Sequence, residues 1–210
     1  MAEIGDTPTI RVRGEAAVRA EPDEAIVWIT LSALEASPGP ALADVSARSR
    51  ALVAILDELG VAAADRSTTG INLSEEFDHT AQGRRSLGHR ASSAVSVRLT
   101  DAEIVGRLVA RAAEELAAHI GGPRWQIAPD NPVRLEAARA AAADAARKAS
   151  AYAEGVGARL GRPLGLTEPA GPPAMIRTAS GRGLEPLPVD PGEHEVLAEI
   201  EVTFALEPGG

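Results

Sequence analysis

Three carboxylates lie close together around a proline near the N-terminus, in the run Glu21-Pro22-Asp23-Glu24. Carboxylates at this spacing could form an acid/base pair or part of a metal site. The run lies between two segments that alternate in polarity as strands do. Because proline fixes φ and aspartate can bond backbone two residues on, Pro22 and Asp23 also suit a structural turn. We favour the turn, which the carboxylates shape and solvate.

A second acidic run, Glu75-Glu76-Phe77-Asp78-His79, offers oxygen and imidazole ligands for a divalent ion. One hypothesis is therefore a metal-assisted hydrolase that uses Glu75, Asp78 and His79. However, successive strand side chains point to opposite faces, which separates Glu75 from Asp78. We expect a charged strand end here, with no metal and no other cofactor. The run Glu193-His194-Glu195 is likewise predicted to be the solvated start of a strand.

Other catalytic signatures are missing from the sequence. There is no cysteine, which excludes thiolate catalysis, and no G-x-S-x-G nucleophile elbow. The segment 169–193 is rich in proline and glycine and shows no periodicity, so it is predicted to be a long loop. Arg177 and Arg182 make this loop locally basic, and it is a candidate interaction loop. No catalytic residue is assigned.

The composition is that of a globular protein. The 210 residues are 45% hydrophobic and 24% charged, with only 2% aromatic residues, and the net charge is −9. An acidic chain without a basic stripe is not expected to bind nucleic acid. No apolar run approaches the length of about 18 residues that would predict a membrane span. The opening residues lack an apolar export region, which predicts a cytoplasmic location.

Alternation and helical spacing predict the elements in the order β-β-α-β-β-α-β-α-β-β. The fold class is α+β: a largely antiparallel sheet with helices packed on one face, whose centre (25–128) is the split β-α-β pattern of ferredoxin-like folds. The first and last strands are expected to share a sheet. The long helix, 132 to about 160, is predicted to turn inward a stripe that includes Leu135, Tyr152 and Val156. Residues 78–89 are predicted to be a hairpin loop, and the helix after Thr100 to end at Gly121-Gly122.

Five stretches together resemble the SIMPL-domain (DUF541) family. In chain order they are "IRVRGEAAVRAEPDEA", "LGVAAADRSTTGINLSEEF", "GHRASSAVSVRLTD", "EAARAAAADAARKASAYAEGVGARLG" and "PGEHEVLAEIEVTFAL". The resemblance implies a soluble α+β protein that forms closed homo-oligomers and is linked to stress tolerance or protein–protein interaction. It implies no catalytic residues. Many relatives are exported, which would mean a periplasmic or secreted protein if an export signal has been removed.

The sequence therefore favours a non-enzymatic, homo-oligomeric interaction or scaffold protein. Residues 9–207 would form a single SIMPL-like domain after a flexible N-terminus at 1–8. The Ala-rich helix and the terminal strands could pair between copies of the chain. The alternatives are a small-ligand or peptide-binding module that closes the 169–193 loop over a groove, and the metal-assisted hydrolase.

Overall fold

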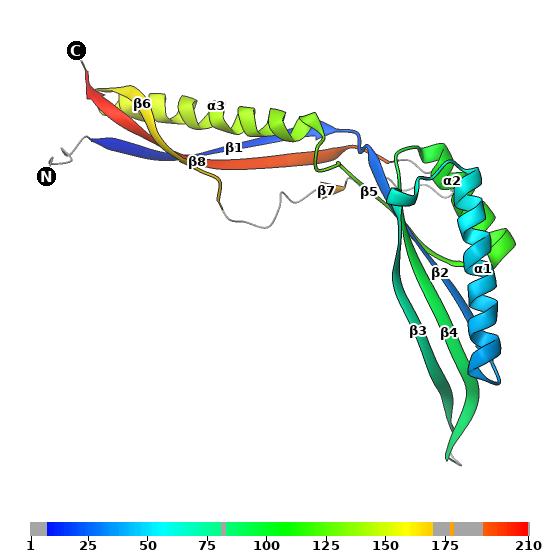
Figure 1. The fold of residues 1–210 in the computed structure, drawn as a ribbon. Helices are drawn as coiled ribbons and strands as arrows, with labels where there is room; N and C mark the ends of the chain where they lie inside the picture. Colours follow the sequence, from blue (N-terminus) through cyan, green and yellow to red (C-terminus); the bar gives the residue numbers. More distant parts are fainter. Residues whose placement is uncertain (1–7, 81–82, 170–176, 179–190, 210) are drawn as a thin grey trace, which may run out of the picture. The chain divides into compact units, whose positions relative to one another are not determined.

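The computed structural model describes residues 8–80, 83–169, 177–178 and 191–209. The chain divides into two compact units, which we describe separately. The first consists of 1–22, 127–182 and 192–210, and the second of 23–126 and 183–191. The predicted order of elements is confirmed, with two short additions, a two-residue strand (Figure 1) and the 3-10 helix Ala63–Asp65. The prediction that residues 9–207 form a single domain stays a prediction.

The first unit contains a small antiparallel sheet in the order β1-β8-β6. Strands β1 (Thr9–Ala20) and β8 (His194–Pro208) pair over the full length of β1, which confirms that the two terminal strands share a sheet. Strand β6 (Ala158–Thr167) and the short β7 (Arg177–Thr178) also pair with β8. Strand β8 is therefore a central strand, with β1 on one side and with β6 and β7 on the other, and both of its edges are paired within the chain.

Helix α3 (Pro132–Gly155) covers one face of this sheet. Its buried apolar side chains recur every four residues: Val133, Ala137, Ala141, Ala145, Ala149 and Ala153. A row at this spacing runs obliquely around a helix, so it follows the twist of the strands beneath it. The inward stripe predicted from the sequence, which also included Ala145 and Ala149, is right for these two buried alanines and wrong for Leu135, Tyr152 and Val156, which are 61%, 61% and 73% exposed. We call the buried row Val133 to Ala153 the alanine ridge; it packs against the sheet of the same chain.

The second unit contains the sheet β3-β4-β2-β5, formed by β2 (Glu24–Glu35), β3 (Arg66–Thr80), β4 (Gly83–Leu99) and β5 (His119–Gln126). All three pairings are antiparallel, and β4 is inserted between β2 and β3. This is the predicted split β-α-β arrangement. The α+β class is confirmed, although the strands form two sheets rather than one.

Helices α1 (Pro38–Glu58) and α2 (Ala102–Leu116) lie on one face of this second sheet (Figure 1). They bury the alternate residues of β2: Ala25, Val27, Ile29, Leu31 and Ala33. Asp101 caps α2 by accepting the backbone N–H of Glu103. The predicted end of this helix at Gly121-Gly122 is wrong. It ends at Leu116, where the next residue, Ala117, adopts the left-handed conformation (φ 44°). Ile120 and Trp125 of β5 then pack against the core.

The predicted loop at 78–89 is also wrong, because both strands of the hairpin continue through it. Strand β3 runs to Thr80 and β4 begins at Gly83, so that the hairpin extends beyond α1 (Figure 1). Arg90 pairs with Glu76, and the guanidinium of Arg84 lies 3.3 Å from the ring centroid of Phe77. These cross-strand contacts hold together a polar segment that composition alone would assign to a loop.

Candidate functional site

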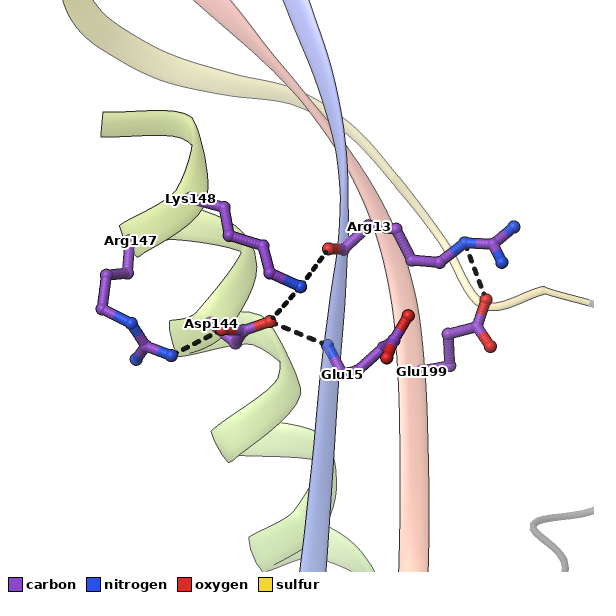
Figure 2. A network of polar contacts seen from close by, with 6 residues as sticks. All are labelled: Arg13, Glu15, Asp144, Arg147, Lys148 and Glu199. Carbon is purple, nitrogen blue, oxygen red and sulfur yellow. Dashed lines mark hydrogen bonds and ion pairs between the residues drawn. The ribbon is translucent and has the colours of Figure 1, made fainter. Parts of the chain in front are cut away.

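A buried carboxylate joins α3 to β1 in the first unit. Asp144 is 9% exposed and accepts the backbone N–H of Glu15 at 3.0 Å (Figure 2). Its side chain also pairs with Lys148 at 2.7 Å and with Arg147 at 2.5 Å. Lys148 in turn donates to the backbone carbonyl of Arg13 at 3.1 Å. Asp144 and Lys148 are an i,i+4 pair on α3, and this pair faces the strand rather than solvent.

Electrostatics hold Asp144 in its charged form. The hydrogen bond from Lys148, followed by that from the Glu15 backbone, lowers the pKa of the Asp144 carboxyl, and the same contact raises the pKa of Lys148. A carboxylate with a lowered pKa whose oxygens already accept several donors is a poor general base at neutral pH. The network therefore positions the helix, and it offers no acid/base chemistry.

Gly14 lies beside this network and lets the helix approach the strand. A Cβ placed on Gly14 would lie 2.1 Å from the carbonyl oxygen of Ala141 and 2.7 Å from the amide nitrogen of Ala145. Glycine is the residue that such close contact of two backbones requires. The opposite face of β1 carries the cross-strand ion pairs Arg11–Glu201, Arg13–Glu199 and Arg19–Glu195.

The edges of the two sheets differ in how open they are to another strand. The edge strand β1 displays that row of charged pairs, β6 contains Pro163 between two register shifts, and β5 is short and contains Pro123. Charges, prolines and irregular register are the usual protections of an edge. Strand β3 is 15 residues long, contains no proline, and pairs on one side with β4.

Strand β3 also carries exposed apolar side chains. Ile71 and Leu73 lie opposite the buried Ser93 and Ala91 of β4, so they point to the helix-covered face of the sheet. Helix α1 packs mainly on β2 and β4, which leaves Ile71 74% and Leu73 42% exposed. Val53 of α1 is 47% exposed as well. We call the open side of β3 with Ile71 and Leu73 the β3 edge; it is the candidate functional site.

Two of the predicted metal ligands, Glu75 and Asp78, have described side chains. Glu75 accepts a hydrogen bond from Ser86 at 2.7 Å, and Asp78 is exposed. The His79 side chain lies outside the described part of the chain. Within the described ranges no three His, Cys, Asp or Glu side chains come close enough to hold a metal ion. The hydrolase assignment stays an untested hypothesis.

The predicted turn at Pro22 and Asp23 lies where the chain passes from the first unit to the second. Its neighbour Glu24 is not solvated as expected, because it is 6% exposed, accepts from Gln126 and pairs with Arg98 at 3.4 Å. Arg98 also binds Asp65 at 2.7 Å. Glu24 therefore belongs to a charged cluster within the second unit.

Other predicted residues lie elsewhere. Arg182 and most of the 169–193 loop fall outside the described residues, and only the backbone of Arg177, in β7, is placed. The predicted solvated position of His194 is wrong: it is 1% exposed at the start of β8, and burial lowers its pKa. Sequence alternation signals this burial, since His194 is in phase with Val196, Ala198 and Ile200.

Comparison with known proteins identifies the family. Residues 10–204 match the family described as "SIMPL: Protein of unknown function (DUF541)". The chain belongs to this SIMPL family. The predicted resemblance is thus confirmed over nearly the whole chain. Because the family description names no activity, the expectation that the protein is not an enzyme remains a prediction.

Two curated relatives are similar along most of the chain. Each is a 26 kDa periplasmic immunogenic protein, one from Brucella melitensis biotype 1 and one from Brucella abortus strain S19. Each is 27% identical over 217 residues, which cover 94% of this chain and 84% of the relative. The cytoplasmic location predicted from the opening residues is therefore wrong, because relatives that match nearly the whole chain are named periplasmic proteins and point to export.

Solved structures give only a weak likeness. A hydantoinase/carbamoylase family amidase from Burkholderia ambifaria is 18% identical, with a TM-score of 0.24. Another from Burkholderia vietnamiensis is 16% identical, with the same TM-score. The matches cover 48% and 63% of this chain but 27% and 33% of those chains. A likeness of this size carries no argument about fold or activity.

Proposed function

We propose that this SIMPL protein is a non-enzymatic interaction protein that assembles from several copies of itself. The single observation that carries the proposal is the β3 edge, whose segment 70–76 is regular, contains no proline and carries exposed apolar side chains. An open strand of this kind is a template for pairing with another chain. The Ala-rich helix and the terminal strands do not support the proposal, because they pack against each other within the chain.

Export agrees with this proposal. The two relatives are named periplasmic proteins, and we propose the same compartment for this chain. None of the described helices is long and apolar enough to cross a membrane. A role in stress tolerance, which the family resemblance implies, is the proposed setting. A deletion strain that grows as well as its parent under heat and acid would remove that role.

Size-exclusion chromatography with multi-angle light scattering tests the assembly. The expected mass is a multiple of the 21.6 kDa chain mass at micromolar concentration. A mass of 21.6 kDa across the accessible concentrations would refute the proposal. The peptide-binding module predicted from the sequence would close the 169–193 loop over a groove, and most of that loop lies outside the described residues. A different peptide-binding role would use the β3 edge itself, since an extended peptide can also add a strand. It predicts a monomer that gains mass only with a peptide present.

A further inference from the structure

We propose that two copies pair antiparallel through β3, with a two-fold axis at Asn72, to form one continuous eight-stranded sheet. This inference rests on the proposed self-assembly and names the surface that carries it. A two-fold interface requires that one patch be complementary to itself. The test of the idea is therefore whether β3 has a register in which its own residues match.

Two irregularities limit the stretch that can pair. The register between β3 and β4 shifts between Thr68 and Gly70 and again between Glu76 and Phe77. The regular part of the strand is thus 70–76, and bulges disturb the edge on either side. A short regular segment leaves only a few registers for a second copy.

The apolar side chains select one of these registers. With the axis at Asn72, Ile71 lies opposite Leu73 of the second copy, and Leu73 lies opposite its Ile71. Residues directly opposite in an antiparallel pair have Cβ atoms about 4.5–5.5 Å apart on the same face. The contact between Ile71 and Leu73 therefore forms twice, and it covers both exposed side chains of each copy. The short residues Gly70 and Ser74 then face each other across the strands.

The charges exclude the registers that are shifted toward the C-terminus. An axis at Leu73 would place Ile71 opposite Glu75, and an axis at Ser74 would place Leu73 opposite Glu75. Axes at Glu75 or Glu76 would oppose like charges. With the axis at Asn72, these glutamates lie opposite Thr69 and Thr68. Like charges directly opposite are destabilising, and this register contains none. Glu76 keeps its pair with Arg90.

The helix layer agrees with the same geometry. Ile71 and Leu73 point to the face that α1 and α2 cover, but α1 leaves them open. In the proposed pair, the two uncovered β3 strands meet in the middle of the sheet, and their apolar side chains form one strip between the two copies of α1. The exposed Val53 of each copy lies on that helix.

Because the chain contains no cysteine, a single introduced thiol reports the pairing directly. In the proposed register Asn72 opposes itself, with Cα atoms about 4.5–5.5 Å apart, which is within disulfide range. Under mild oxidation, N72C should form a reducible dimer of twice the 21.6 kDa chain mass on a denaturing gel. The matched control E75C should remain at the monomer mass, because its two copies lie six residues apart, roughly 20 Å.

A second variant tests the apolar match without a thiol. In I71E, the fraction of protein in the dimer or larger species should be at most half of that in wild type, because a carboxylate would then face Leu73 of the second copy. Since Ile71 is exposed, the melting temperature should stay close to that of wild type at concentrations where both are monomeric. L135E is the control, because Leu135 is 61% exposed on α3 and should leave the mass unchanged.

The outcomes separate the register from the proposed function. Dimers of N72C but not of E75C support the pairing. If wild type is oligomeric but N72C stays monomeric on the gel, or if E75C cross-links instead, the pairing is overturned and self-assembly stands. Wild type that is monomeric in light scattering overturns both. A peptide that binds β3 while N72C remains uncross-linked assigns the edge to another chain, and it also overturns the pairing.

Discussion

Replacing Gly14 by alanine should strongly destabilise the first unit. The new Cβ would lie 2.1 Å from the carbonyl oxygen of Ala141, whereas real Cβ atoms essentially never approach other atoms closer than 3.0 Å. The obstacle is helix backbone, which cannot rotate away as a side chain can. Helix α3 must therefore move outward by most of an ångström, which loosens the alanine ridge and lengthens the bond from the Glu15 amide to Asp144.

Overpacking of this kind costs about 1–3 kcal/mol, and a clash with rigid backbone belongs at the upper end. We expect a loss of about 3 kcal/mol in the free energy of unfolding of this unit. In a unit of roughly 100 residues, each kcal/mol shifts the melting temperature by about 4–8 °C, so a loss of about 3 kcal/mol should lower it by roughly 12–24 °C. Urea and thermal unfolding followed by far-ultraviolet circular dichroism measure both quantities.

Gly155→Ala is the matched control, because Gly155 ends the same helix and has no atom within 4 Å of its Cβ position. It should be neutral or raise stability by up to about 1 kcal/mol. If Gly14→Ala unfolds at the same urea concentration as Gly155→Ala, α3 does not approach β1 closely. Asp144 then does not hold the helix against the strand.

Three further predictions concern charge and strain. Because the folded-state pKa of Asp144 is lowered, the stability that this carboxylate gives the fold should be full above about pH 4 and lost as pH falls through the folded-state pKa. Asp144→Asn should lower the urea midpoint of unfolding at pH 7, and the midpoint of this variant should decline less steeply in acid than that of wild type. Burial lowers the pKa of His194, so as pH drops below about 6.5 the unfolded state takes up a proton before the folded state does, and the free energy of unfolding should fall. His194→Gln should abolish that part of the pH profile of stability. An unchanged profile would contradict a lowered pKa of His194. Gly88 has φ +122° and its Cβ would lie 2.4 Å from the Glu35 carbonyl oxygen, so Gly88→Ala should cost about 1–3 kcal/mol, whereas Gly39→Ala, in open space, should cost nothing measurable by urea titration.

The order of elements was predictable, because alternation and helical spacing are local signals. The division into two sheets was not. Strands β1 and β2 are separated by only three residues, which suggests a hairpin, yet β1 pairs with β8 from the far end of the chain. Alternation tells which face of a strand is buried and does not tell which strand lies beside it.

The buried face of α3 could not be found from hydrophobicity. The ridge consists mostly of alanines, while the larger Leu135, Tyr152 and Val156 are exposed. The close approach at Gly14 selects small residues for the inner face, which reverses the usual relation between size and burial. Asp144 was visible as half of an i,i+4 pair with Lys148, but its burial depends on the Glu15 amide, 129 residues away in the chain.

The β3 edge was only half visible in the sequence. The alternation of Ile71 and Leu73 predicts a strand with an apolar face, and the structure places that strand at an edge. Their exposure results from the reach of α1, which covers two neighbouring strands and stops before the third. The width of a helix layer relative to its sheet is a property of tertiary packing, and no local pattern encodes it.

Sedimentation velocity of the wild-type protein beside I71E tests the central claim most directly. Wild type should sediment as an assembly of 21.6 kDa chains and I71E should shift toward the single chain, while L135E should behave as wild type. A wild-type protein that sediments as one 21.6 kDa chain at every concentration would contradict self-assembly. An assembly of I71E as stable as that of wild type would remove the β3 edge as its surface.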